Sequence, residues 1–225
     1  LGADSIEAGQ RAALIGMVAV VAFMVACYGG FGIMANIALA LNMGLLLAAL
    51  SVMGATLTLP GIAGIVLTMG MAVDANVLIF ERIREELRQG RPAGRAIEIG
   101  FDKALSAIMD SNITGLLTAL IMFGVGSGPV RGFAITLGLG ILTSMFTAVY
   151  VTRLIIETWM RWKKPKAIAL KGFIKLAPDK TSIDFFRAQW LTFGASVVAV
   201  VASLLLVATL GLNFGIDFKG GTTIR

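Results

Sequence analysis

The chain has 225 residues, of which 57% are hydrophobic and only 14% charged, with 27 glycines and a mean hydropathy of +0.89. This composition excludes a water-soluble globular protein and is typical of a protein that crosses a membrane several times. The net charge of +6 arises from 19 basic and 13 acidic residues, and in membrane proteins such an excess usually marks cytoplasmic loops rather than a nucleic-acid site.

The residues that bind metals or shuttle protons in soluble enzymes are nearly absent. Cys27 is the only cysteine and lies within an apolar run, and the chain has no histidine. A disulfide framework, a thiolate metal site and an imidazole relay are therefore excluded, and we expect no cofactor and no metal. Carboxyl groups remain as the side chains that could titrate within a membrane.

The first three apolar segments predict three membrane-spanning helices joined by short turns. The turn Gly29 to Gly32 separates the first two. Pro60 opens the third within its first turn, where a missing N–H group costs nothing. These spans are expected at residues 12–28, 35–57 and 60–80.

Small residues recur at the spacing of helix contacts. Gly61 and Gly64 in the third span, and Ala134 and Gly138 further on, are three or four positions apart. Such pairs let the backbones of neighbouring helices approach closely in a membrane. We expect a packing role for them.

The third span contains a single acid, Asp74, in an otherwise apolar run from Ile62 to Phe80. Asp74 precedes the charged segment that begins at Glu81, so at about 1.5 Å per residue it lies roughly 10 Å inside that boundary. An ionisable group at this depth costs at least a few kcal/mol and by default marks a transport or relay site. The alternative is a neutral structural carboxyl that is hydrogen-bonded to a neighbouring helix. Asn76, two positions on, is expected on a different face.

The first strongly charged stretch runs from Glu81 to Lys103, and Gly90 to Pro92 breaks it. In its second half, apolar residues recur at three-to-four spacing opposite charged ones, a pattern that predicts an amphipathic helix on the membrane surface, with contact to a partner as the alternative. The apolar positions of this helix are Ala96, Ile97, Phe101, Ala104 and Leu105.

The fourth and fifth spans are expected at residues 107–123 and 133–156. The fourth carries Asp110 and Asn112 near the same membrane face as the charged stretch, so both could reach the Asp74 side of the third span. Asp74, Asn112 and Asp110 are therefore the candidate proton-relay residues. Alternatively, Asp110 is a solvated residue that complements the N-terminus of its helix, nearer the aqueous boundary, and Asn112 is structural.

The distribution of basic residues predicts the topology. Six of the 19 basic residues lie between Arg82 and Lys103, and nine lie between Arg153 and Arg187. A sixth span is expected at residues 190–210, followed by a polar end whose Thr222, Thr223 and Ile224 suit a β-strand. Because basic loops face the cytoplasm, both ends of the chain are expected outside it, and topology alone explains the net charge.

Motifs of enzymes are missing from the sequence. The run from Lys219 to Thr222 has the wrong order for a phosphate-binding loop, and neither a Ser–His pair nor a His–Glu–x–x–His motif is present. We therefore expect no enzyme and no use of ATP. A membrane bundle with one buried acid instead suits the coupling of ion flow to a conformational change.

Three segments resemble a known family. Residues 70–87 read GMAVDANVLIFERIREEL and residues 1–12 read LGADSIEAGQRA, and both resemble SecD, a membrane subunit that assists protein export. Residues 211–225 read GLNFGIDFKGGTTIR and resemble the start of SecF after its first span. The resemblance implies a SecD–SecF fusion fragment with a SecD-like membrane domain at 1–160, a basic cytoplasmic linker at 161–189, and a SecF-like span with the start of an outer domain at 190–225.

The same resemblance implies an all-helical, polytopic bundle of the resistance–nodulation–division superfamily in the bacterial inner membrane, with both ends of the fragment on the periplasmic side. It implies that the proton-motive force drives export, and Asp74 matches the family's intramembrane SecD aspartate. Expected partners are the Sec translocon channel, the remaining SecF helices, the translocating preprotein and the lipid bilayer, with no nucleic acid. The alternatives are a proton-driven exporter of small molecules or lipids and a passive translocon scaffold.

Overall fold

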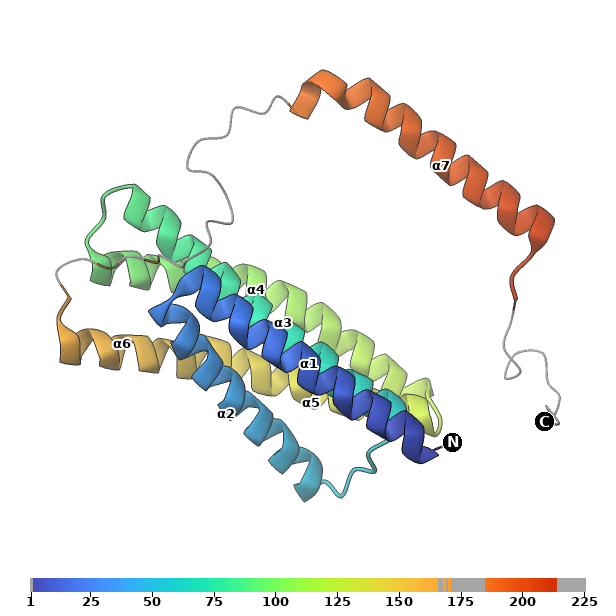
Figure 1. Cartoon of the computed structure of the whole chain (residues 1–225), viewed down its shortest axis with the longest axis horizontal. Helices are drawn as coiled ribbons and strands as arrows, with labels where there is room; N and C mark the ends of the chain where they lie inside the picture. Colours follow the sequence, from blue (N-terminus) through green and yellow to red (C-terminus); the bar gives the residue numbers. More distant parts are fainter. Residues whose placement is uncertain (1, 166–167, 169, 171–184, 214–225) are drawn as a thin grey trace. The chain divides into compact units, whose positions relative to one another are not determined.

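The structure, a computed structural model, describes residues 2–165, 168, 170 and 185–213, and it separates into two units, Leu1–Leu176 and Ala177–Arg225. Each unit is described by itself. The first is a bundle of long helices, and the second contains one long helix (Figure 1). The helices of the first unit are α1 (Gly2–Tyr28), α2 (Gly30–Val52), α3 (Leu59–Arg88), α4 (Ala93–Val125), α5 (Pro129–Phe146), the π-helix η1 (Thr147–Val151) and α6 (Thr152–Lys163); those of the second are the 3₁₀-helix η2 (Phe185–Ala188) and α7 (Gln189–Leu210).

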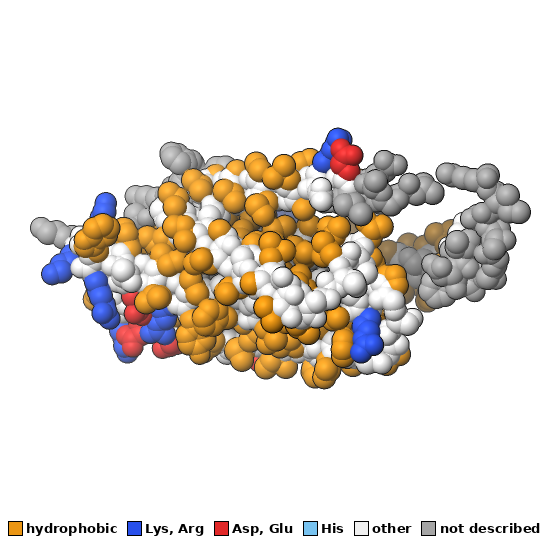
Figure 2. Space-filling view, turned by 90° about the horizontal axis from the view of Figure 1, so that it is seen from below, with side chains coloured by type: hydrophobic (Ala, Val, Ile, Leu, Met, Phe, Trp, Pro, Cys, Tyr) orange, Lys and Arg blue, Asp and Glu red, His pale blue; other side chains and the backbone are white. Residues whose placement is uncertain are grey.

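Within the described residues, six helices are long and apolar enough to cross a membrane, with α5, η1 and α6 forming one continuous span. This confirms the prediction of an all-helical, multi-pass membrane protein. The second span begins at Gly30 rather than at residue 35, because Gly29 alone makes the turn after Tyr28, with φ at 56°. In Figure 2 the visible face of the protein is mainly hydrophobic, and most of the charged side chains in view gather at its left end.

Helix α3 packs against α5, α4 and α1 and lies at the centre of the bundle (Figure 1). Its first turn is capped by Thr58, whose Oγ1 accepts a hydrogen bond of 3.1 Å from the N–H group of Gly61. Pro60 lies in that turn, as predicted. Gly90, with φ at 80°, follows the last turn and reverses the chain towards α4.

Small residues bring α3 and α5 into close contact. A Cβ atom placed on Gly140 would lie 2.3 Å from Cγ2 of Thr68, and one on Gly64 would lie 2.4 Å from Oγ1 of Thr136. Neither position has room for a larger side chain. Of the other small residues singled out in the sequence, Ala134 is buried, and Gly138 faces Ala119 of α4. The predicted close approach of the helices is therefore confirmed.

The amphipathic segment expected on the membrane surface is instead the first part of α4. Ile97 and Phe101 are each only 4% exposed, and a Cβ atom on Gly100 would lie 2.9 Å from the backbone nitrogen of Ile83 on α3. The apolar stripe is thus covered by protein rather than by lipid. The physical reason is that α3 also extends beyond the hydrocarbon layer, so its own last turns offer an apolar partner.

Ion pairs hold the α3–α4 hairpin together at its charged end. Glu86 is fully buried, and its carboxylate oxygens lie 2.7 Å from Nε of Arg91 and 2.7 Å from Nζ of Lys103. A buried carboxylate requires such partners, because burying it without them is strongly unfavourable. Glu86 therefore joins the turn of the hairpin to both of its helices.

The α7 helix is apolar on every side, and none of its residues is buried. Such a helix is stable within lipid or against other membrane helices. It confirms the sixth predicted span. Most of the predicted linker and the predicted strand at residues 222–224 lie outside the described residues.

Candidate functional site

Asp74 lies on the face of α3 that points away from the bundle. Its side chain is exposed, whereas Val73 and Ala75 on either side of it are buried. One turn earlier, a Cβ atom placed on Gly70 would meet nothing within 4 Å, and two turns earlier Leu67 is 48% exposed. The acid therefore occupies an open strip of α3 that no other described helix of the first unit covers.

Asp74 has no hydrogen bond or ion pair with any described residue. The described residues also contain no group of His, Cys, Asp and Glu side chains that could hold a metal ion. A lone acid facing hydrocarbon is costly, so membrane proteins place such groups against protein or water. This strip is thus a surface that needs a partner.

Asn76 lies on the opposite side of α3, as predicted, and is only 2% exposed. Its Nδ2 donates a hydrogen bond of 3.2 Å to the carbonyl oxygen of Ala72. The hydroxyl group of Thr152 donates to Oδ1 of Asn76 over 3.0 Å. This pair connects α3 to α6 within the buried core.

The partner of Asn76 is positioned by an irregular turn in the fifth span. Residues Thr147–Val151 form a π-helix between α5 and α6, and Oγ1 of Thr152 also lies 3.1 Å from the carbonyl oxygen of Thr147. Such π-turns contain one extra residue and often occur at functional sites. Thr152 was not predicted from the sequence, although a hydroxyl residue inside an apolar span is the signal that could have drawn attention to it.

The acid and the amide of α4 have different surroundings. Asp110 is exposed, and Asn112 is 7% exposed, with its Nδ2 donating 2.7 Å to the carbonyl oxygen of Ile108. No described hydrogen bond joins either residue to Asp74. The structure therefore does not bring the three predicted relay residues into direct contact.

Asp110 is not a residue of a helix N-terminus, because α4 begins at Ala93. The interpretation that it complements the dipole of its helix is therefore wrong. The contacts of Gly100 with Ile83 and of Gly115 with Met71 set the antiparallel register of α3 and α4. In this register Asp74 lies level with residues 109–112, so Asp110 is about as deep as Asp74 rather than nearer the aqueous boundary.

Comparisons with known proteins agree on one family. Residues 2–162 match the family model described as "Protein export membrane protein SecD/SecF, C-terminal", and residues 205–225 match that of the "SecD/SecF GG Motif". The chain is 56% identical over 170 residues to the protein translocase subunit SecD of Rhodobacter capsulatus, covering 76% of this chain and 31% of that protein. It is 46% identical over all 225 residues to the protein translocase subunit SecDF of Brucella abortus, of which it covers 30%.

A solved structure has the same arrangement of helices. The crystal structure of SecDF from Thermus thermophilus, described as a translocon-associated membrane protein, matches 98% of this chain with a TM-score of 0.89 and 40% identity. The chain spans about 30% of the length of that protein, as it does for SecDF of Brucella abortus. The family models, the sequence identities and the structural similarity lead to the same conclusion: the chain belongs to the SecD/SecF family of protein export membrane proteins.

Proposed function

We propose that this chain is the membrane part of an accessory subunit of the Sec export machinery, and that it uses the proton-motive force to promote translocation of secretory proteins. The names of its relatives support the export role. The partners would be the translocon channel, the translocating preprotein and the remaining SecF helices. The protein would lie in the bacterial inner membrane, with the basic loops in the cytoplasm and both ends of this chain on the periplasmic side.

The observation that carries the proton-driven mechanism is the open strip around Asp74. A titrating group that is exposed on a bundle surface, in a helix otherwise apolar at that depth, needs protein or water to face it. The chain covers only 31% and 30% of these two relatives, and in this proposal membrane helices from the remaining part of the full-length protein cover the strip. Protonation of Asp74 would remove its charge and so change the free energy of contact with those helices.

Asp110 and Asn112 are secondary candidates for the relay. Asp110 shares the depth of Asp74 and is exposed, so it could exchange protons with water near the same level. Asn112 cannot titrate, and its buried amide would act by hydrogen bonding alone. Since neither residue contacts Asp74, water or side chains of the covering helices would have to connect them.

The proposal is tested in the full-length protein by Asp74→Asn, which keeps the shape of the side chain but removes the titrating group. Export of a secretory substrate into inverted membrane vesicles is measured with and without an uncoupler of the proton gradient. We expect Asp74→Asn to lose the gradient-dependent stimulation at normal protein levels, because a neutral amide is cheaper to bury than a carboxylate and should not impair folding. Asp74→Glu should keep part of the stimulation.

The alternatives predict other outcomes of the same assay. A passive scaffold would tolerate Asp74→Asn, with full uncoupler-sensitive stimulation. An exporter of small molecules or lipids would leave preprotein translocation unchanged in both variants. Either result would reject the proton-driven export role.

A further inference from the structure

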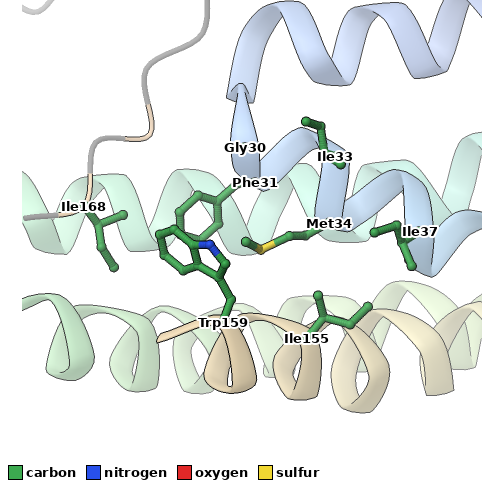
Figure 3. Close-up of a pocket in the computed structure, with 8 residues that line it drawn as sticks. All are labelled: Gly30, Phe31, Ile33, Met34, Ile37, Ile155, Trp159 and Ile168. Atoms are coloured by element: carbon green, nitrogen blue, oxygen red, sulfur yellow. The ribbon is translucent and has the colours of Figure 1, made fainter. Parts of the chain in front are cut away.

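We propose that an apolar groove between α2 and α6 is a binding site for one anionic phospholipid, with an acyl chain in the groove and the phosphate group at the basic end of α6. The groove has a volume of about 460 Å³. Figure 3 shows Phe31, Met34 and Ile37 of α2 on one side, Ile155 and Trp159 of α6 on the other, and Ile168 at one end.

The lining of the groove suits hydrocarbon. All of its residues are glycine, isoleucine, phenylalanine, methionine or tryptophan, so the indole N–H group is its single polar side-chain group. The rings of Phe31 and Trp159 meet edge to face with centroids 6.0 Å apart, which fixes the floor of the groove. Ile33 and Ile37 are about half exposed, at 53% and 48%, and form an open apolar rim.

The end of α6 that follows Trp159 carries an excess of positive charge. Trp159 and Lys163 are four positions apart on α6 and therefore share one face of the helix. Arg161, Lys163 and Lys164 are all exposed, none has an ion-pair partner among the described residues, and residues 158–165 contain no acid. Long basic side chains at the end of a span extend to the headgroup region, where they attract anionic lipids.

The size of the groove favours a lipid over another helix. On α2 its lining extends from Gly30 to Ile37, which is about 10 Å along the helix axis. A membrane-spanning helix needs a contact surface closer to the full hydrocarbon thickness of about 30 Å. The groove lies at the start of α2, which begins at Gly30, and near the end of α6, which ends at Lys163, and this position corresponds to the headgroup side of one leaflet, where a tryptophan is typically found. These dimensions match the upper part of one acyl chain with its headgroup above it.

Trp159 provides a direct readout of an acyl chain in the groove. In the whole chain, Trp162→Phe and Trp190→Phe leave Trp159 as the only tryptophan, since the sequence contains three. The protein is reconstituted into phosphatidylcholine vesicles that contain an equal mole fraction of either brominated phosphatidylglycerol or brominated phosphatidylcholine. Bromine on the acyl chains quenches a tryptophan that it touches, so quenching reports the lipid that occupies the groove.

We expect brominated phosphatidylglycerol to quench Trp159 more strongly than brominated phosphatidylcholine. Lys163→Gln with Lys164→Gln should abolish most of this preference, because each basic residue near the surface changes the relative affinity for an anionic lipid about fivefold. Both lysines are exposed, so these changes should not disturb folding.

The matched control moves the single tryptophan to position 154. It adds Leu154→Trp and Trp159→Phe to the chain that already carries Trp162→Phe and Trp190→Phe. Leu154 is on the same helix and 65% exposed, but it does not line the groove. This tryptophan should be quenched equally by both lipids. Equal quenching of Trp159 by the two lipids would reject the anionic-lipid site, and protection of Trp159 from both would show that protein fills the groove instead.

Discussion

The pair Asn76 and Thr152 shows how much a single buried polar contact depends on tertiary structure. The sequence predicted that Asp74 and Asn76 would lie on different faces of one helix. Residues three or four positions apart share a face of a helix, whereas residues two positions apart do not. It did not predict the partner of Asn76, since Thr152 is 76 positions away and reaches it only beyond the π-turn.

Replacing Thr152 by valine should weaken the bundle. Valine has nearly the same shape but no hydroxyl group, so Oδ1 of Asn76 would lose its hydrogen-bond donor in a site that water does not reach. We expect the free energy of unfolding, measured by titration with a denaturing detergent in mixed micelles, to fall by about 1 kcal/mol.

The control for this variant is Thr118→Val. Thr118 is exposed, and its hydroxyl group bonds only within its own helix, to the carbonyl oxygen of Thr114 at 3.0 Å. Its replacement should change the free energy of unfolding much less. Equal losses in the two variants would mean that the Asn76–Thr152 contact adds nothing beyond a local hydroxyl bond.

Among the helices, the close contact between α3 and α5 depends on glycine. Gly140→Ala would place its Cβ atom 2.3 Å from Thr68, so α3 and α5 would have to separate. We expect a loss of about 1–3 kcal/mol in the free energy of unfolding, as for other overpacked sites. Gly70→Ala is the matched control, because a Cβ atom there meets nothing within 4 Å, and it should be neutral or stabilising. Destabilisation by Gly70→Ala as large as that by Gly140→Ala would contradict this explanation.

The first part of α4 was recognised as an amphipathic helix, but its environment was not. A three-to-four pattern reports which side of a helix is apolar and not whether lipid or protein covers that side. The sequence analysis treated the amphipathic helix and the fourth span as separate elements, whereas the structure has one helix of 33 residues. Its length is about 50 Å, well beyond the hydrocarbon thickness of about 30 Å.

Because protein covers this apolar stripe, it should stay protected without a bilayer. We expect residues 96–105 of the unaltered protein to resist proteolysis in detergent micelles. Phe101→Ser should make the segment readily cleaved, whereas Leu105→Ser, at a position already 38% exposed, should not. Rapid cleavage of the unaltered segment in micelles, with protection in vesicles, would restore the membrane-surface interpretation.

For the molecule as a whole, the number of spans was the most reliable prediction. Six long apolar runs are visible without any tertiary information, because a helix must bury about 20 residues in hydrocarbon. The candidate site was predicted only in part. The depth of Asp74 follows from its distance to Glu81, but the open strip around it and the equal depth of Asp110 require the packing of α3 and α4.

The proposed topology is tested with single cysteines in a Cys27→Ala parent. Lys163→Cys should resist an impermeant thiol reagent added to spheroplasts and react after lysis, because the proposed orientation places the basic loops in the cytoplasm. Met53 lies in the connection between α2 and α3 and is 60% exposed. Met53→Cys should therefore react in intact spheroplasts. The reverse pattern would invert the orientation of the whole bundle.

The π-turn in the fifth span also changes the phase of the helix. One extra residue in a turn rotates everything after it by about 100° relative to a continuous α-helix. The buried positions record this change: Leu137, Ile141 and Ser144 alternate by four and three, whereas Ala148, Thr152 and Ile156 follow at intervals of four. A helical wheel drawn straight through this span would therefore assign the wrong face to α6, and deleting one residue from the π-turn would swing Thr152 and Trp159 away from α3 and α2 while leaving the glycine contacts of α5 in place.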